Sequence, residues 1–280
     1  MGHHGQMHSQ PGVGTCPDTP VEVGFGRQAG RATGEGMTAP LAPDPDRPEP
    51  GYLPATGFRS RRSALSGAQR ETWERLWPEL GISAGTASGG REGAEPLDTG
   101  VWFGRVAPVV LEIGCGSGTS TLAMAKDEPG IDVIAVEVYR RGLAQLLCAM
   151  DRERVGNIRL IRGNAIDVLA HRIAPGSLTG VRVFFPDPWP KARHHKRRFL
   201  QPATIGLIAD RLLPGGVLHA ATDHPGYAEH IAEAGDGEPR LRRADADSRL
   251  PISVVRPTTK YETKAHDAGN SVTEFVWRRL

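Results

Sequence analysis

The stretch from Val109 to Thr119 constrains the fold of this 280-residue chain more than any other. Residues 109–113 are apolar except for Glu112, which is typical of a short buried strand. A predicted helix opens directly after the turn, at residues 119–126. Between the strand and the helix every second residue is a glycine, at Gly114, Gly116 and Gly118. Glycines there allow a tight turn and a close approach of a ligand to the backbone, so the stretch predicts the first half of a nucleotide-binding βαβ unit.

The second half of that unit follows at residues 132–137, another apolar run that predicts a buried strand. It ends in an acid, Glu137, about 20 residues beyond the last glycine of the turn, where a carboxylate can accept hydrogen bonds from a ribose. We therefore predict that Glu137 binds the sugar of a nucleotide-like cofactor.

The spacing of the glycines narrows the class of ligand. A nicotinamide fingerprint is G-x-G-x-x-G, but here the pattern is G-x-G-x-G and residue 119 is threonine. Glu112 precedes the turn, and a carboxylate is a poor neighbour for a pyrophosphate. It suits a cationic ligand such as the sulfonium and amino group of S-adenosylmethionine. The alternative is an ordinary βα turn whose glycines only permit close packing.

The rest of the chain alternates predicted strands and helices, which indicates an α/β fold with a mainly parallel sheet and helices on both faces. An N-terminal helix is predicted from the capping-box pair Ser66 and Gln69. Residues 83–100 are predicted to be a loop. Further strands are predicted at 158–161, 181–185, 217–222 and 271–277, and further helices at 202–213, at 227–234 and around the apolar stripe Leu143, Leu146, Leu147 and Met150.

Polar side chains follow these strands where ligands of open α/β sheets bind, beyond the carboxyl ends. Asn164 is predicted to reach an adenine edge, whereas Asp167 is predicted to cap the following helix. The group at the strand ends comprises Glu112, Glu137, Asn164, Asp187 and Asp223.

A second constellation follows the strand at 181–185. Pro186-Asp187-Pro188-Trp189 predicts a stiff turn that holds a carboxylate and an indole at the mouth of the site. A partly mobile loop is expected after it, with the cations Lys191, Arg193, Lys196, Arg197 and Arg198. Cations of this kind contact phosphates and an indole can stack on a base, which favours a polyanionic partner. The alternatives are a solvated face, or arginines that brace the sheet.

Composition indicates where the folded domain begins and which kinds of site and location are expected. The net charge is +2, and residues 1–50 contribute three basic and six acidic residues, so the remainder carries +5. Residues 1–50 are rich in Gly and Pro and are predicted to be disordered, with His3, His4 and His8 in a flexible tail, whereas 51–280 are predicted to form the folded domain. The three cysteines do not have metal-type spacing, which predicts reduced thiols and no metal. The sequence has no apolar run of membrane-spanning length and no signal-peptide core. We therefore predict a cytoplasmic protein without a membrane partner.

These motifs resemble those of the bacterial tRNA (guanine-N7)-methyltransferases over roughly residues 58–280. The resemblance rests on Leu111–Gly118, on the basic segment from Phe184 to Arg198, on Ala221-Thr222-Asp223 and on Arg256–Glu262. It implies a Rossmann-like class I methyltransferase domain with a seven-stranded sheet, active as a monomer or a homodimer. It also implies methyl transfer from S-adenosylmethionine to N7 of guanine 46 in the variable loop of tRNA. Ala192 departs from the family, which often has a basic residue there, and residues 1–50 lie outside the match.

The resemblance further implies roles for individual residues. Asp187 is the expected catalytic carboxylate, and it lines the cofactor site together with Glu112, Glu137 and Asn164. The expected tRNA contacts are Lys191, Asp223, Thr259, Lys260, Tyr261 and Glu262.

The chemistry agrees with these residues. Guanine N7 is an acceptor without a proton, so no strong general base and no metal is required. Catalysis should come from alignment of N7 with the methyl group and from a fixed carboxylate, Asp187, near the purine as it becomes cationic. Two alternatives remain at this stage. One is an amino-group methyltransferase, whose D-P-P-aromatic turn resembles Asp187-Pro188-Trp189, and the other is a non-catalytic RNA-binding protein of the same fold.

Overall fold

The structure is a computed structural model that describes residues 64–84, 95–245, 249–257 and 271–280. The predictions for the N-terminal residues 1–50 lie outside the described residues. So do those for Thr259, Lys260, Tyr261 and Glu262.

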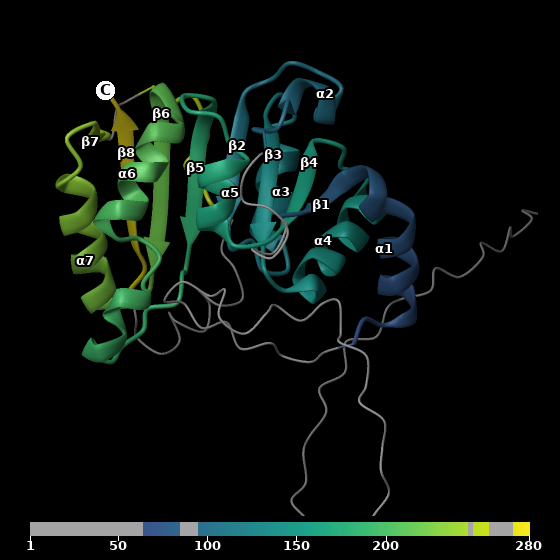
Figure 1. Cartoon of the computed structure of the whole chain (residues 1–280), viewed down its shortest axis with the longest axis horizontal. Coiled ribbons are helices and arrows are strands. Elements are labelled where there is room, and N and C mark those ends of the chain that lie inside the picture. Colours follow the sequence, from purple (N-terminus) through teal and green to yellow (C-terminus); the bar gives the residue numbers. More distant parts are fainter. Residues whose placement is uncertain (1–63, 85–94, 246–248, 258–270) are drawn as a thin grey trace, which may run out of the picture. The chain divides into compact units, whose positions relative to one another are not determined.

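The described residues form one mainly parallel sheet, as predicted (Figure 1). It has eight strands rather than seven, in the order β1-β4-β3-β2-β5-β6-β8-β7. The sequence patterns missed both β1 and β7, because these strands have three residues each, too few to show an alternating pattern. Only the pairs β6–β8 and β7–β8 are antiparallel among the described strands. The strands are β1 (Gly81–Ser83), β2 (Val109–Ile113), β3 (Asp132–Glu137), β4 (Ile158–Arg162), β5 (Leu178–Phe184), β6 (Leu212–Thr222), β7 (Leu241–Arg243) and β8 (Thr273–Arg279).

Helices cover both faces of the sheet, which confirms the predicted layers (Figure 1). Leu111 and Ile113 of β2 pack in the cluster that includes α5, α6 and α7, whereas Val133 and Ala135 of β3 pack in the cluster of α1, α3 and α4. The helices are α1 (Gly67–Leu80), α2 (Thr99–Phe103), α3 (Thr119–Asp127), α4 (Arg140–Glu153), α5 (Ala165–His171), α6 (Pro202–Arg211) and α7 (Pro225–Asp236), with a 3-10 helix η1 (Ala192–Arg197).

Local sequence explains most of these elements. Ser66 and Gln69 form the predicted capping box at the start of α1. The stripe from Leu143 to Met150 is buried, which explains the amphipathic helix α4. Several boundaries differ from the predictions. Helix α2 begins within the predicted loop at 83–100. Helix α6 ends at Arg211 rather than at 213, and β6 begins at Leu212 rather than at 217, so that the strand includes the Pro-Gly-Gly stretch.

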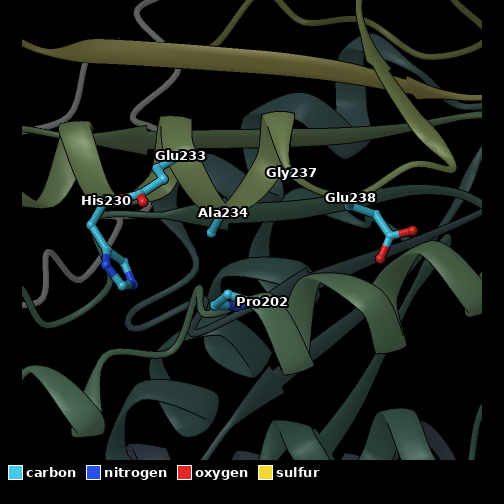
Figure 2. A pocket seen from close by; sticks show the side chains of 6 residues that line it. All are labelled: Pro202, His230, Glu233, Ala234, Gly237 and Glu238. Atoms are coloured by element: carbon cyan, nitrogen blue, oxygen red, sulfur yellow. The ribbon is translucent and has the colours of Figure 1, made fainter.

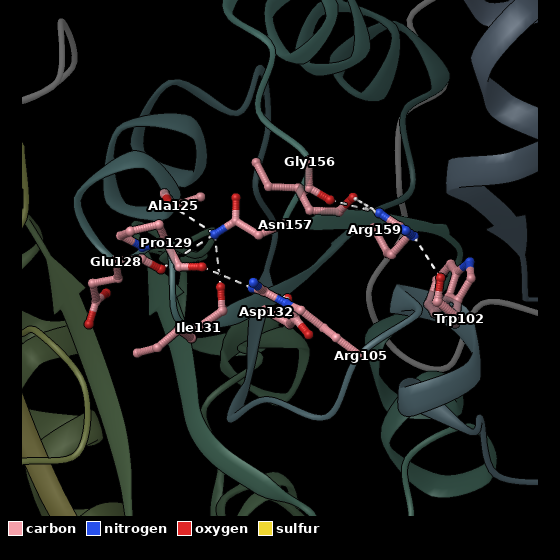
Figure 3. Close-up of polar contacts among 11 residues, drawn as sticks. Trp102, Arg105, Ala125, Glu128, Pro129, Ile131, Asp132, Gly156, Asn157 and Arg159 are labelled. Carbon is pink, nitrogen blue, oxygen red and sulfur yellow. Dashed lines mark hydrogen bonds and ion pairs between the residues drawn. The ribbon is translucent and has the colours of Figure 1, made fainter.

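The amino ends of the parallel strands carry a dense polar network (Figure 3). Asn157 donates from its side-chain amide to the carbonyls of Ala125 at 2.9 Å and Ile131 at 2.8 Å, and to Glu128 at 3.4 Å. Arg105 donates twice to one carboxylate oxygen of Asp132, at 2.9 and 2.6 Å. Arg159 donates to the carbonyls of Trp102, Gly156 and Ile158. This network ties the loops that enter β3 and β4 to neighbouring segments.

The part of the chain that the structure describes contains no helix long and apolar enough to cross a membrane. The same residues contain no cluster of three or more His, Cys, Asp or Glu side chains arranged to hold a metal.

Candidate active site

The glycine turn has the geometry that its sequence predicts. Gly114, Gly116 and Gly118 all have positive φ, at 75°, 57° and 75°, a conformation that favours glycine. A Cβ at Gly118 would lie 2.5 Å from Leu146, so packing accounts for that glycine. A Cβ at Gly114 or Gly116 would meet no atom of the described residues within 4 Å. Packing alone therefore does not explain these two, and space remains next to their backbone.

Glu137 fixes the turn to the end of β3. One of its carboxylate oxygens accepts from the Gly116 amide at 3.0 Å. The other accepts from the amides of Val138 at 2.7 Å and Tyr139 at 3.0 Å. Burial raises the pKa of Glu137, and the nearby charge of Asp187 raises it further, while the three amide hydrogen bonds oppose the rise. The side chain therefore lies beside the glycine turn in a rigid position.

Glu112 is 3 % exposed on β2, at the start of the turn. Thr121, in the first turn of α3, donates to Oε1 of Glu112 at 2.9 Å, whereas Oε2 of Glu112 is buried and has no hydrogen-bond partner among the described residues. Burial raises the pKa of Glu112 to about 7. A buried carboxylate with a free oxygen is suited to a cationic ligand, because the cation would offset the cost of its ionisation.

Asn164 lies just after β4 and is the N-cap of α5, where its Oδ1 accepts from the Ile166 amide at 3.0 Å. The prediction that Asp167 caps this helix was wrong, because Asp167 already lies in the first helical turn. The Nδ2 of Asn164 is buried without a partner, so one donor stays available at the strand end.

The Asp187 turn is conformationally strained. Phe185 and Trp189 have positive φ, at 51° and 44°, which is uncommon for bulky side chains. The Phe185 amide donates to the Ala221 carbonyl at 2.8 Å, which attaches the start of the turn to β6. Asp187 lies between them and is exposed, and its charge contributes to the raised pKa of Glu137.

The basic segment separates into exposed and buried arginines and lysines. The expected loop contains η1, and Lys191, its N-cap, is exposed together with Arg193 and Lys196. The guanidinium of Arg197 lies 5.1 Å from the ring centre of Trp189. The prediction that Arg198 contacts phosphate was wrong. That side chain is 4 % exposed, donates to the carbonyls of Pro188 and Gly226, and covers the ring of Tyr227.

The sheet order brings the described predicted site residues to one edge. β4, β3, β2, β5 and β6 are successive neighbours in the sheet. β3 ends in Glu137, and β4, β2, β5 and β6 are followed by Asn164, the glycine turn, Asp187 and Asp223 respectively. Glu112 lies within β2, one residue before its end. Asp223 is half-buried between β6 and α7.

Sequence reasoning missed Gly142. This residue lies inside α4, where a Cβ would collide with the carbonyl of Gly116. A glycine inside a helix costs about 1 kcal/mol relative to alanine, so its presence within a predicted helix is a signal of close backbone packing. Here it lets α4 support the turn from behind.

A groove lies elsewhere, between the start of α6 and the second half of α7 (Figure 2). Its volume is about 420 Å³, and Pro202, His230, Glu233 and Glu238 are among the residues that line it. None of the predicted site residues that the structure describes lines this groove.

Comparisons with known proteins show which family the chain resembles. A family model described as "putative methyltransferase" matches residues 106–275. The tRNA (guanine-N(7)-)-methyltransferase of Mycobacterium avium is 71 % identical over the full length of both chains. The protein of that name from Mycobacterium leprae is 74 % identical over 81 % of this chain and 98 % of its own. The crystal structure of the aminoglycoside resistance methyltransferase NpmB1 covers 62 % of this chain and 87 % of its own, with 16 % identity and a TM-score of 0.40. From the family model and the curated relatives, the chain belongs to the family of bacterial tRNA (guanine-N7)-methyltransferases.

Proposed function

We propose that this protein transfers the methyl group of S-adenosylmethionine to N7 of guanine 46 in the variable loop of tRNA. The observation that carries the proposal is the buried, unpartnered oxygen of Glu112 beside an open glycine turn. That combination fits a cationic nucleoside better than a dinucleotide, because a pyrophosphate would be repelled by the carboxylate. The family to which the chain belongs supports the same reaction.

The residues present fit this cofactor. Glu112 would accept from its amino group, and the open backbone at Gly114 and Gly116 would admit it next to the turn. Glu137 has carboxylate lone pairs beyond its three amide contacts for the ribose hydroxyls. Asn164 would donate its free Nδ2 to a ring nitrogen of the adenine. When bound, S-adenosylmethionine supplies a methyl group on a positively charged sulfur, ready for attack by a nucleophile.

Asp187 is the proposed catalytic residue. Guanine N7 attacks with its own lone pair, so no proton has to be removed from it. The purine gains positive charge as the carbon–nitrogen bond forms. An exposed carboxylate on a rigid turn stabilises that charge, and it orients the base by accepting hydrogen bonds from the N–H groups of the guanine. Pro186 and Pro188 restrict the turn, which reduces the motion that would otherwise misplace the carboxylate.

The substrate assignment rests on charge around that turn. Lys191, Arg193 and Lys196 are exposed next to it and would contact tRNA phosphates. Trp189 presents an indole that Arg197 covers on one side, and Asp223 offers a carboxylate at the end of the neighbouring strand. Thr259 to Glu262 are proposed as further tRNA contacts from their sequence motif. We expect the protein to act in the cytoplasm, where tRNA is modified.

Mass spectrometry of tRNA treated with the protein and S-adenosylmethionine tests the proposal. Digestion to nucleosides should give 7-methylguanosine, and fragment mapping should place it in the variable loop. An Asp187→Asn variant should give none under the same conditions. A methylated exocyclic amino group would contradict the assignment in favour of the amino-group alternative. Absence of product together with absence of cofactor binding by calorimetry would favour a non-catalytic RNA-binding protein.

A further inference from the structure

Arg256 contacts both aromatic residues that lead into the Asp187 turn. Its guanidinium carbon lies 5.4 Å from the ring centre of Phe184 and 5.0 Å from that of Phe185. The side chain is only 3 % exposed. A buried guanidinium requires a hydrogen-bonded anion, and Glu274 on β8 supplies it, with its Oε1 at 2.7 Å from Nη2 of Arg256. The segment at 249–257 is thereby joined to the end of β5.

Glu274 is itself held from a second side. Its other oxygen lies 2.9 Å from Nε2 of His219, which is fully buried on β6. The His219 ring meets Phe184 edge-on, with ring centres 4.9 Å apart. The hydrogen bond from His219, followed by the contact with Arg256, lowers the pKa of Glu274 to about 2. Glu274 is therefore an anion throughout the neutral range and links two groups that both touch Phe184.

The turn needs such support because Phe185 has a φ of 51°. Left-handed backbone at a bulky residue is strained and persists only where the surroundings over-determine it. The hydrogen bond from the Phe185 amide to Ala221 is one restraint. Arg256 over the Phe185 ring is a second restraint, and it comes from a different part of the chain.

We propose that Arg256, fixed by Glu274, is a positioning residue that holds Phe185 in its left-handed conformation and so sets the place of the Asp187 carboxylate. This inference rests on the proposed function, because it assigns the position of the turn a role in methyl transfer. Neither residue belongs to the carboxylates and amide that we assign to cofactor or substrate. Their effect on the reaction would be exerted through Phe184 and Phe185.

The main test is Arg256→Met, which keeps a long apolar side chain over the rings and removes the charge. We expect kcat for tRNA methylation to fall by about 10- to 100-fold, the loss typical of a misplaced catalytic group. The calorimetric Kd for S-adenosylmethionine should stay within about twofold, because Glu112 and Glu137 are untouched. In protein labelled with fluorotryptophan, the NMR signal assigned to Trp189 should shift, since Trp189 closes the same turn.

Arg243→Met is the matched control. Arg243 also covers two aromatic rings, those of Phe275 and Trp277, and also pairs with a carboxylate, Asp236. It lies on β7, which β6 and β8 separate from β5, and in the described part of the chain no hydrogen bond, ion pair or ring contact joins Arg243 to residues 184–189. This variant should leave kcat and the Trp189 signal unchanged. Because Arg243 is more exposed than Arg256, thermal unfolding of both variants has to be measured alongside.

Glu274→Gln keeps the test decisive if Arg256→Met does not fold. The Glu274 side chain is 39 % exposed, so an amide is tolerated there, yet it weakens the hold on Arg256. We expect a smaller loss of kcat, about 3- to 10-fold, in a protein that remains folded. An unchanged kcat in either folded variant would overturn the inference, and so would a loss no larger than the fall in folded fraction. If the wild-type protein does not methylate tRNA, the proposed function itself fails.

Discussion

The two ends of the same parallel strands use polar groups in opposite ways. At the amino end, the side chains of Asn157, Arg105 and Arg159 donate hydrogen bonds to backbone carbonyls and to Asp132 (Figure 3). No buried polar atom of these residues is without a partner in the described structure. At the carboxyl end, Glu112 and Asn164 each keep one buried atom unpaired. Full pairing stabilises a fold, whereas an unpaired buried group is a cost that a ligand can remove.

Glu137 and Asn157 make this contrast concrete. Each is tied to three backbone groups, amides for Glu137 and carbonyls for Asn157. Only Glu137 lies beside open space at the glycine turn. Three backbone contacts therefore position a ligand-binding side chain at the carboxyl ends of the strands and stabilise the fold at their amino ends. Substitutions at the two ends should accordingly have different effects.

The largest effect is expected for Asp187→Asn, which removes the charge and keeps the shape. We expect single-turnover methylation to fall by at least ~100-fold, the usual loss when one electrostatic stabiliser of a transition state is removed. The affinity for tRNA should change little, because the phosphates are contacted elsewhere. Glu229→Gln, at an exposed site on α7, controls for the loss of one surface charge. A full single-turnover rate in Asp187→Asn would show that the turn is not catalytic.

Glu137→Ala should weaken S-adenosylmethionine binding by about 2 kcal/mol, or roughly 30-fold, because it loses charge-assisted hydrogen bonds to the cofactor and the anchor of Gly116. Binding of tRNA should change much less. Isothermal calorimetry with each ligand measures both. Equal weakening of the two ligands would remove Glu137 from the cofactor site.

Asn157→Ala should lower the stability of the fold and leave cofactor binding unchanged. Three carbonyls lose their shared donor, so the free energy of unfolding should fall by about 2 kcal/mol. Cofactor affinity and turnover of the folded protein should be unchanged. Urea titration followed by calorimetry below the unfolding transition provides both values. A loss of cofactor affinity in the folded variant would contradict the idea that the amino ends of the strands contribute only to stability.

The pKa of Glu112, about 7 in the protein without ligand, predicts how cofactor binding depends on pH. A cation binds the ionised carboxylate, so affinity should be complete above pH 7 and should be lost as the pH falls through 7, by about tenfold per pH unit. Calorimetry between pH 5.5 and pH 7.5 tests this below the titration of the ligand's own amino group. In Glu112→Gln the slope should vanish. A slope that survives this substitution would have to come from another group.

The smallest effect concerns the exposed lysine at the start of η1. Lys191→Ala should reduce the slope of log affinity against log salt by about 0.7–0.9, the value for one phosphate contact. Lys126→Ala serves as the control, since Lys126 is also exposed but pairs with Glu153. Filter binding across a salt series measures the slopes. An identical decrease in both variants would mean that only net charge matters.

Local patterns were sufficient for much of the fold and for part of the site. The apolar runs at β2 and β3, the glycine turn and the acids at the strand ends are all short-range features. The structure places Glu112 and Glu137 in β2 and β3, near their ends, as these features predict. The cap of α5 was misassigned because Asn164 and Asp167 are both good capping residues within one helical turn.

Long-range packing explains what could not be predicted. Arg197 and Arg198 are neighbours in a basic run, and composition does not say which one turns inward. Arg198 is buried because Tyr227, far along the chain, offers a ring and Gly226 a carbonyl. The three-residue strands β1 and β7 owe their pairing to β4 and β8 rather than to a pattern of their own.

Those two short strands have a consequence for the protein in a crowded cell. They form the outer edges of the sheet, and an exposed edge is a template on which another chain can add a strand. With three residues each, β1 and β7 present few unpaired backbone groups, and β7 carries two arginines, Arg242 and Arg243. Short length and like charge both oppose edge-to-edge pairing between copies. A sheet of eight strands is thereby protected from aggregation at its borders.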